Sequence, residues 1–328
     1  MSYFKDGDSG RRSFLRDGAA GALAFPAVLS GMQAAKAIKV GLVGCGGRGT
    51  GAATQALKAD DYAELTAVAD VDMARIDQSL ARVQKAAGQK VKVESDKKFV
   101  GLDAYRQVVD SGVDVVLLAT PPGFRPDHIR YAIEQGKHVF CEKPVAVDAP
   151  GCRSVLATSE LAAKKDLSLV AGFCWRYSNF IKETFNQIAN GAIGDIVSYY
   201  ATYYTGPVKP MPPASERPAG MSDVEWQIRN WYNFCWTCGD SLVEQAVHSI
   251  DKVAWAFKDQ PPISCVAVGG RQIPQPSGNI YDHFDVNYLY PNNVRAFVVN
   301  RQTTGCHNEN ADYIMGTKGV CTIGRGPQ

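Results

Sequence analysis

Short apolar runs alternate with helical patterns between residues 38 and 165. The apolar runs have the length and the β-branched content of buried strands. They lie at 38–43, 64–69, 91–93, 113–119 and 138–141. Helices are expected between them, at about 50–57, 73–87, 105–109 and 127–135. This repeated strand–helix order predicts a doubly wound parallel sheet of the Rossmann type within an α/β fold.

The pattern changes beyond residue 165, where the expected strands become longer. They alternate apolar with polar residues, which is typical of a mostly antiparallel open sheet with one face covered. These strands are expected at 196–204, 263–271, 281–290 and 294–301. A helix over 241–257 carries apolar residues at spacings of three and four. The sequence therefore predicts a Rossmann domain over 38–165 and an α+β domain over 166–328.

Two segments of the second domain stand out by composition. Residues 206–220 contain five prolines and are expected to form a loop. Residues 226–236 are crowded with Trp, Tyr and Phe. Such aromatic side chains either stack on a sugar ring or pack in the core, and the sequence leaves both readings open.

The composition is that of a globular protein without a polyanionic partner. Hydrophobic residues make up 45% and charged residues 21% of the 328 positions, which excludes extended disorder and coiled coil. Lys and Arg number 35 against 33 Asp and Glu, too small an excess for a nucleic-acid-binding surface. The nine cysteines suggest no disulfide framework, and Cys235 and Cys238 lack a second pair at zinc-site spacing. No metal is expected.

The first 37 residues have the order of an export signal. Arg11 and Arg12 form a twin-arginine pair, a mildly apolar stretch follows at 19–32, and Ala35-Lys36-Ala37 is a small-x-small cleavage site. This order predicts a bacterial Tat-type signal peptide over 1–37 and a periplasmic location; the alternative is a tail with an accidental arginine pair. Without these residues the chain has no net formal charge, and no membrane span is expected.

A glycine-rich turn joins the first strand to the first helix. Gly44, Gly46 and Gly49 have G-x-G-x-x-G spacing, with Gly47 and Arg48 between them. The first glycine permits the tight turn, the second admits a pyrophosphate close to the backbone, and the third lets helix and strand pack closely. The helix N-terminus adds free N–H groups and a positive dipole end. The turn is therefore predicted to bind the phosphates of a dinucleotide.

Asp70 ends the second strand, 21 residues after Gly49. A carboxylate at this place accepts hydrogen bonds from the ribose hydroxyls of NAD and repels the 2′-phosphate of NADP. The alternative role for Asp70 is an N-cap of the helix that begins near Met73. NAD is the expected cofactor, and the nearby cations Lys39 and Arg48 keep NADP as a second candidate.

The helix predicted over 241–257 carries ionisable side chains beside its apolar face. On a 3.6-residue period, Glu244, His248 and Asp251 share one stripe. His248 would take a proton from a substrate hydroxyl, and Glu244 would orient it from one turn earlier. A surface pair or a satisfied core histidine is the structural alternative.

Glu142-Lys143-Pro144 resembles the E-K-P signature of the Gfo/Idh/MocA oxidoreductases, the family of glucose-fructose oxidoreductase and inositol dehydrogenase. Further resemblances cover most of the chain after residue 37. They are the glycine turn, Ala69-Asp70, Ala119-Thr120-Pro121, Gly172-Phe173 with Arg176-Tyr177, Gly191–Gly194 and Glu244–Asp251. The last segment departs twice from the family's D-x-G-x-H-x-x-D pattern, because Glu244 replaces Asp and Ala246 replaces Gly.

The resemblance implies where the ligands bind. Lys143 would lie beside the nicotinamide and the substrate, where a lysine at the carboxyl edge of a sheet can act on a hydroxyl proton. The expected cofactor-binding residues are Gly44, Gly46, Gly47, Arg48, Gly49, Asp70, Thr120, Pro121, Glu142 and Lys143. The expected substrate-binding residues are Lys143, Arg176, Tyr177 and His248, and the expected catalytic residues are Lys143, His248 and Glu244.

The resemblance also implies a chemistry: oxidation or reduction at a hydroxyl of a sugar, cyclitol or glycoside. A homo-oligomer formed through the C-terminal sheet is expected, as is a chain that stops before its closing element. Export favours a tightly bound cofactor that is regenerated on the enzyme. The alternatives are a glycoside-processing hydrolase or epimerase that oxidises its substrate transiently, and a non-catalytic sugar-binding relative, which the substitutions at Glu244 and Ala246 motivate.

Overall fold

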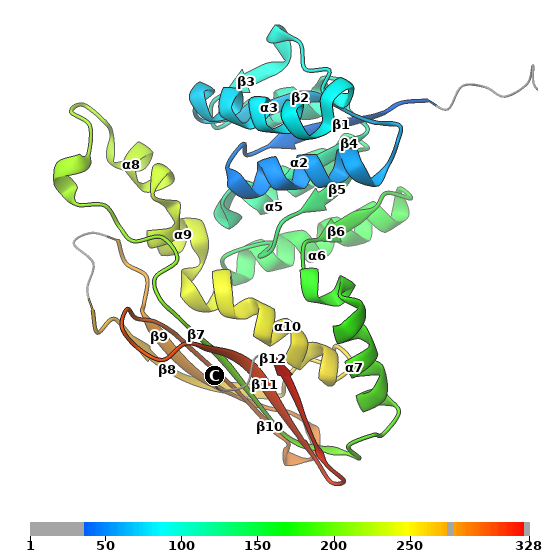
Figure 1. The fold of residues 1–328 in the computed structure, drawn as a ribbon, viewed down its shortest axis with the longest axis vertical. Coiled ribbons are helices and arrows are strands. Elements are labelled where there is room, and N and C mark those ends of the chain that lie inside the picture. The colour runs from blue at the N-terminus through cyan, green and yellow to red at the C-terminus, as the bar shows by residue number, and fades with distance from the viewer. Residues whose placement is uncertain (1–35, 274–277, 325–328) are drawn as a thin grey trace, which may run out of the picture.

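The computed structural model describes residues 36–273 and 278–324, and the predicted signal peptide lies outside them except for its last two residues. The described chain forms two sheets of six strands each, one in each half of the molecule (Figure 1). No helix of this described part is long and apolar enough to cross a membrane.

The first sheet is parallel throughout and runs in the order β3-β2-β1-β4-β5-β6. Its strands are β1 (Ile38–Val43), β2 (Ala63–Asp70), β3 (Lys98–Val100), β4 (Val115–Leu118), β5 (His138–Cys141) and β6 (Leu169–Ala171). The strand order reverses between β1 and β4, which is where a doubly wound sheet opens a crevice at its carboxyl edge. The predicted Rossmann architecture is confirmed.

Helices cover both faces of this sheet. They are α2 (Gly47–Ala59), α3 (Met73–Ala87), α4 (Ala104–Asp110), α5 (Arg125–Glu134) and α6 (Ala149–Lys164). Successive β1 residues enter opposite cores, since Leu42 packs with α2 and α3 while Val43 packs with α4, α5 and α6. Apolar residues on both faces of β1 and β4 follow from this double cover.

Two expectations and one alternative for this domain are wrong in detail. Residues 91–93 form no strand, because Val91 makes only a single bridge to Leu65; the third strand is β3, three residues long and at the sheet edge. The domain continues past residue 165, since β6 pairs with β5 in the same sheet. Asp70 does not cap α3, because the cap is Asp72, whose carboxylate accepts the N–H of Ala74.

The second sheet runs in the order β12-β11-β7-β10-β9-β8 and is antiparallel except between β7 and β10. Its strands are β7 (Ile196–Thr205), β8 (Ser264–Gly270), β9 (His283–Leu289), β10 (Arg295–Gln302), β11 (Glu309–Gly316) and β12 (Val320–Gly324). The mostly antiparallel sheet is confirmed, and β11 and β12 are additions to the predicted strands. Helices α7 (Asn179–Ala189) and α10 (Val247–Ala256) cover one face (Figure 1).

The helix predicted over 241–257 has an irregular first turn. Residues Leu242–Ala246 form a π-helical turn, η9, and the regular α10 begins only at Val247. A π turn inserts extra chain into the helix, so a single 3.6-residue stripe through Glu244, His248 and Asp251 is not maintained. The connection before it contains α8 (Asp223–Arg229) and α9 (Cys235–Cys238).

Short 3-10 turns complete the chain. They are η3 (Gly88–Lys90), η4 (Ser95–Lys97), η5 (Pro122–Phe124), η6 (Cys174–Tyr177), η7 (Ala214–Glu216), η8 (Trp231–Asn233) and η10 (Pro291–Asn293). Of these, η5 and η8 lie beside the crevice of the first sheet and matter for the site.

Candidate active site

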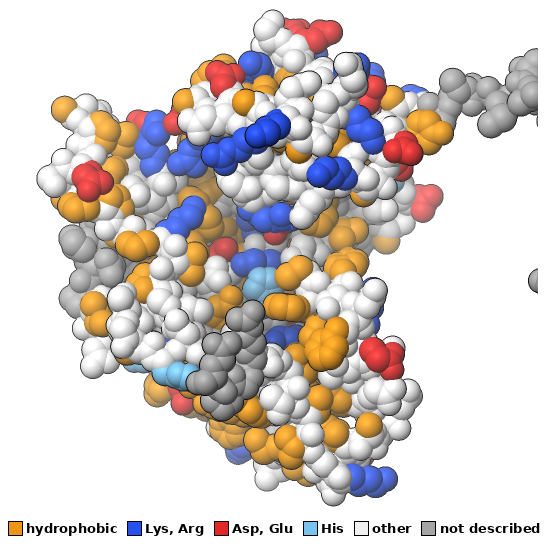
Figure 2. Space-filling view, in the orientation of Figure 1, with side chains coloured by type: hydrophobic (Ala, Val, Ile, Leu, Met, Phe, Trp, Pro, Cys, Tyr) orange, Lys and Arg blue, Asp and Glu red, His pale blue; other side chains and the backbone are white. Residues whose placement is uncertain are grey.

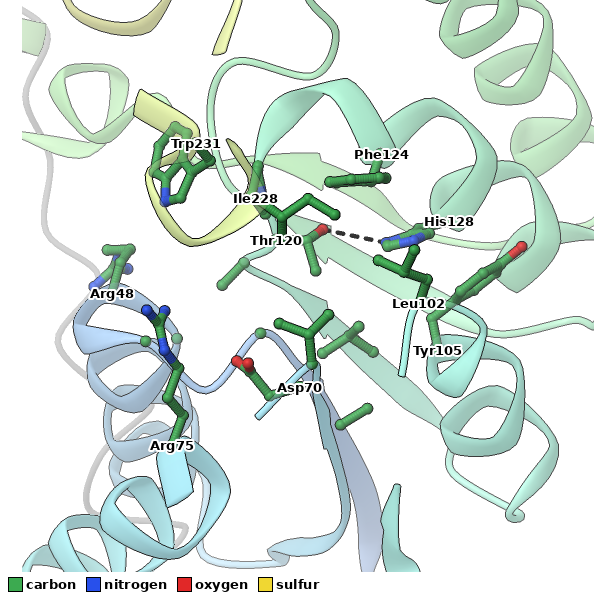
Figure 3. Close-up of a pocket in the computed structure, with 18 of the residues that line it drawn as sticks. Arg48, Asp70, Arg75, Leu102, Tyr105, Thr120, Phe124, His128, Ile228 and Trp231 are labelled. Carbon is green, nitrogen blue, oxygen red and sulfur yellow. Dashed lines mark hydrogen bonds between the residues drawn. The ribbon is translucent and has the colours of Figure 1, made fainter. Parts of the chain in front are cut away.

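A pocket with a cavity volume of about 150 Å³, open to solvent on one side, lies at the carboxyl edge of the first sheet. The glycine turn, the end of β2 and the segment after β4 form its floor, and Ile228 and Trp231 of the second half form its opposite wall (Figure 3). Lys209 of the proline-rich loop also lines it.

The glycine turn leaves room for a phosphate where a side chain would otherwise stand. A Cβ on Gly49 would lie 1.8 Å from the carbonyl oxygen of Gly44, and one on Gly44 would lie 2.7 Å from the backbone of Ala119. Positions Gly46 and Gly47 have no atom within 4 Å of a built Cβ. No side chain caps the N-terminus of α2. The turn is closely packed at Gly44 and Gly49 and open at Gly46 and Gly47. This arrangement fits a pyrophosphate held by backbone N–H groups.

Asp70 is held rigidly at the end of β2. Its Oδ2 accepts the N–H of Cys45 at 2.7 Å and its Oδ1 accepts the N–H of Asp72 at 3.2 Å. This places a carboxylate beside the glycine turn, where a ribose would bind. Arg75, on the first turn of α3, lines the same pocket, and its guanidinium makes no hydrogen bond or salt bridge within the described ranges.

Thr120 and Pro121 also line the pocket, together with three residues that the sequence did not suggest: Tyr105, Phe124 and His128. The Oγ1 of Thr120 lies 3.2 Å from Nδ1 of His128, whose ring stacks on Tyr105 at 4.1 Å (Figure 3). Burial and the charges of Arg125 and Arg106 lower the pKa of His128 to about 3. His128 is thus a neutral, packed side chain that orients Thr120. Its only sequence signal is its position on the helix after β4.

The E-K-P segment follows β5 at the same edge of the sheet. Buried Arg125 donates from Nη1 to the carbonyl oxygens of Glu142, at 2.9 Å, and Pro144, at 2.5 Å. The Glu142 carboxylate accepts from Nε of Arg48 at 2.5 Å. These bonds join the lysine segment to α5 and to the glycine turn, so Lys143 is held in a fixed place between them.

Lys143 and Glu244 meet across the two domains, 101 positions apart in sequence. Lys143 Nζ donates to the carbonyl oxygen of Glu244 and lies 3.3 Å from its Oε1. Both side chains are nearly buried, with exposed fractions of 12% and 9%. Burial raises the pKa of Glu244, and the charges of Lys143 and Arg125 oppose this shift. The π turn η9 carries Glu244 to this contact.

His248 lies one turn further along and is neutral. Burial and the charges of Lys143 and Lys252 lower its pKa to about 4. Its Nδ1 and the Oε2 of Glu244 are buried and have no hydrogen-bond partner among the described residues. Buried polar atoms without partners are rare, so those of His248 and Glu244 are candidates for hydrogen bonds to a polar ligand. The structure therefore brings the three expected catalytic residues together.

Arg176 and Tyr177 lie elsewhere. Arg176 donates from Nε to both carboxylate oxygens of Asp251, at 3.0 and 3.1 Å, and from Nη2 to Asp259 at 2.6 Å. This arrangement ties η6 to α10, and it takes Asp251 out of the predicted acid–histidine stripe. Tyr177 is 61% exposed and lies under the ammonium of Lys182. Neither residue contacts Lys143 or Glu244, and their role in substrate binding stays a prediction.

The cysteines and histidines of the described chain form no group of three ligands that could hold a metal. Cys235 and Cys238 are free thiols, and Cys235 donates to Asp240. The aromatic segment 226–236 has a double role, because Trp231 lines the cofactor pocket while Tyr232 is buried. Tyr232 therefore belongs to the core, and stacking of this segment on a sugar ring stays a prediction.

A Rossmann sheet with an open glycine turn, next to a mixed-sheet domain that adds Lys209 and Trp231 to the same pocket, is typical of two-domain nicotinamide-dependent oxidoreductases. Comparison with protein families agrees. The oxidoreductase family with an NAD-binding Rossmann fold matches residues 38–173, and the GFO/IDH/MocA C-terminal domain matches residues 183–322. The chain belongs to the Gfo/Idh/MocA family, and its first domain is an NAD-binding domain.

Curated relatives include dehydrogenases and glycosidases. Inositol 2-dehydrogenase 4 of Saccharopolyspora erythraea is 33% identical over 48% of this chain and 42% of that protein. Glucose-6-phosphate 3-dehydrogenase of Bacillus subtilis is 28% identical over 67% and 54%. Glycosyl hydrolase family 109 protein 2 of a Shewanella species is 27% identical over 51% and 35%. The chain spans about half the length of these relatives or less.

Solved structures share the fold. Scyllo-inositol dehydrogenase from Lactobacillus casei, with bound NAD(H) and scyllo-inositol, has a TM-score of 0.65 at 22% identity and covers 88% of this chain and 76% of that one. Aldose-aldose oxidoreductase from Caulobacter crescentus has a TM-score of 0.69 at 18% identity, covering 89% and 78%. At these identities the likeness establishes the fold of this chain.

Proposed function

We propose that the protein is an NAD-dependent oxidoreductase that acts on a hydroxyl group of a sugar, cyclitol or glycoside. The observation that carries the proposal is the Lys143–Glu244 contact beside a neutral His248, at the carboxyl edge of an NAD-binding sheet. The inositol and sugar dehydrogenases among the relatives support the substrate class.

The three side chains divide the proton chemistry. His248, with its lowered pKa, is neutral at pH 7 and has a lone pair available to accept the hydroxyl proton. The ammonium of Lys143 donates two of its three N–H groups to Glu244. The third can donate to the substrate oxygen, where negative charge develops. The carboxylate of Glu244 holds the ammonium in that direction. The bound nicotinamide supplies the hydride-accepting ring.

Asp70 favours NAD as the cofactor, whereas the unpaired Arg75 is a cation of the kind that accommodates a 2′-phosphate. We propose NAD as the cofactor used, with NADP bound more weakly. A titration of the purified protein with both nucleotides tests this order.

We also propose that the protein is exported by the Tat route with its cofactor bound, and that the cofactor is regenerated on the enzyme. The twin arginines at positions 11 and 12 support export, and the wall that Ile228 and Trp231 add to the pocket supports retention of the cofactor. Fractionation of cells that express the wild type and the Arg11→Lys/Arg12→Lys variant tests export. Mass spectrometry of small molecules released from the purified protein tests retention.

A redox-neutral reaction is the second candidate, supported by the similarity to a glycosyl hydrolase family 109 protein. In that reaction a hydroxyl is oxidised transiently, the adjacent carbon loses a proton, and the hydride is returned after elimination or epimerisation. The absorbance of reduced nicotinamide separates the two reactions. If the enzyme carries out a net oxidation, a panel of polyols causes a lasting increase in this absorbance. If the reaction is redox-neutral, a panel of glycosides is turned over without a lasting increase. Lys143→Ala is the matched control in both assays. A wild type that binds NAD and turns over neither panel, like this variant, would show that the protein is a non-catalytic sugar-binding relative.

We propose that the protein is a homo-oligomer formed through the second sheet. One face of this sheet lacks a covering helix in the described chain, and its edge strand β8 exposes Val266 and Val268. Sedimentation of the wild type and a Val266→Glu/Val268→Glu variant tests this assignment; a monomeric wild type would refute it.

A further inference from the structure

The second domain places a lysine in the NAD pocket. Lys209 belongs to the proline-rich loop 206–220 that follows β7, yet it lines the same pocket as Gly44, Gly46 and Gly47. Its ammonium lies 5.1 Å from the ring centroid of Trp231. One side of the Lys209 side chain therefore lies against the pocket wall, and the other side is exposed to solvent. Within the part of the chain that the structure describes, Lys209 makes no hydrogen bond or salt bridge.

Charged groups of both domains lie near Lys209. Partial burial and the charge of Arg75 lower the pKa of Lys209, while the charge of Glu244 acts in the opposite direction. The charge of Lys209 in turn opposes the rise in the pKa of Glu244 that burial causes. Lys209 is therefore within electrostatic range of Arg75, which lines the pocket together with Asp70, and of Glu244, which contacts Lys143. Gly46 and Gly47, where the backbone leaves open space for a pyrophosphate, line the same pocket as Lys209.

The pocket has more positive than negative charge. Its lining includes Arg48, Arg75 and Lys209 against the single carboxylate of Asp70. Arg48 is paired with Glu142, whereas Arg75 and Lys209 are cations that repel one another and have no carboxylate bonded to them in the described ranges. Figure 2 shows this concentration of Lys and Arg along the hollow between the two domains. An anion bound between them would remove the repulsion.

We propose that Lys209 binds the pyrophosphate of NAD from the side opposite the glycine turn, so that the second domain takes a direct part in holding the cofactor. The inference rests on the proposed function, because it needs a dinucleotide in the pocket. It adds a cofactor-binding residue outside the Rossmann domain. It also explains the composition of the proline-rich loop, because the prolines limit the freedom of the segment that carries the lysine.

Binding of three probes to the cofactor-free protein tests the proposal: NAD, ADP-ribose, and adenosine, which has no phosphate. We expect Lys209→Met to weaken NAD and ADP-ribose about tenfold and to leave adenosine unchanged, because one charge-assisted contact is lost. The salt dependence of NAD binding should become less steep in the same variant. Lys209→Arg should retain most of the affinity. Lys58→Met, at the exposed end of α2, removes a charge outside the pocket and serves as the control.

The outcomes separate the two levels of inference. If the wild type binds neither NAD nor ADP-ribose, the proposed function itself fails. If the wild type binds NAD and Lys209→Met binds it equally well, the role of Lys209 is wrong while the function stands. Equal weakening of all three probes, or an increase confined to the KM of the sugar substrate, would likewise overturn the assignment to the pyrophosphate.

Discussion

Gly49→Ala tests the packing on which the NAD site is built. The added methyl would lie 1.8 Å from the carbonyl oxygen of Gly44 and 3.2 Å from the Cβ of Ala119. Real carbon–oxygen contacts of this kind stay above about 3 Å, so the first turn of α2 must move away from β1 by roughly an ångström. The oxygen belongs to the backbone of the glycine turn, which cannot rotate aside as a side chain would.

The cost follows from this geometry. Overpacking against backbone is expected to lower the free energy of unfolding by about 1–3 kcal/mol, a fall in Tm on the order of 5 °C. A displacement of about 1 Å in a binding turn is expected to reduce NAD-dependent turnover about 100-fold. Both effects should appear together, because the same movement causes them.

Gly46→Ala is the matched control. Gly46 has an ordinary negative φ of −70° and nothing within 4 Å of the added methyl. Thermal unfolding without cofactor should therefore match the wild type within about 0.5 kcal/mol, while NAD no longer raises the Tm because the methyl occupies the phosphate's space. Wild-type stability in Gly49→Ala would refute the packing argument, and undiminished NAD stabilisation in Gly46→Ala would refute the location of the pyrophosphate.

Three further predictions concern single groups. Because His248 has a pKa of about 4, it stays neutral as pH falls from 7, and kcat/KM should decline only as the pH passes through about 4; a decline centred near 6.5 would contradict its buried, neutral state. Asp70→Ser should reduce the ratio of NAD to NADP affinity about tenfold in equilibrium titrations, and an unchanged ratio would remove Asp70 from the ribose site. Asp312→Asn should lower the free energy of unfolding, measured in urea, by about 3–5 kcal/mol, because it leaves the buried ammonium of Lys252 without its counter-charge. The Lys252→Met/Asp312→Leu double variant should recover most of that loss. A loss below about 1 kcal/mol in Asp312→Asn would show that the pair is not buried.

Local patterns predicted the elements whose cause is local. The runs that became β1, β2, β4 and β5 are apolar because helices cover both faces of the sheet, and that cover is visible as composition. The glycine turn could also be predicted from the sequence, since the spacing of its glycines follows from steric limits within a few residues. The short edge strands β3 and β6 were not found, because three residues held mainly by pairing with a neighbour have no periodicity of their own.

The site divides in the same way. The sequence by itself determined an NAD-binding turn, an acid at the end of β2 and a lysine after β5, because each lies at a fixed place relative to a strand of the parallel sheet. Only the tertiary structure decided that Glu244 reaches Lys143 through a π turn, that Asp251 pairs with Arg176 instead of serving His248, and that Lys209 and Trp231 close the pocket. These contacts join residues far apart in the chain, and their geometry depends on how two separately folded sheets pack against one another, which no local periodicity encodes.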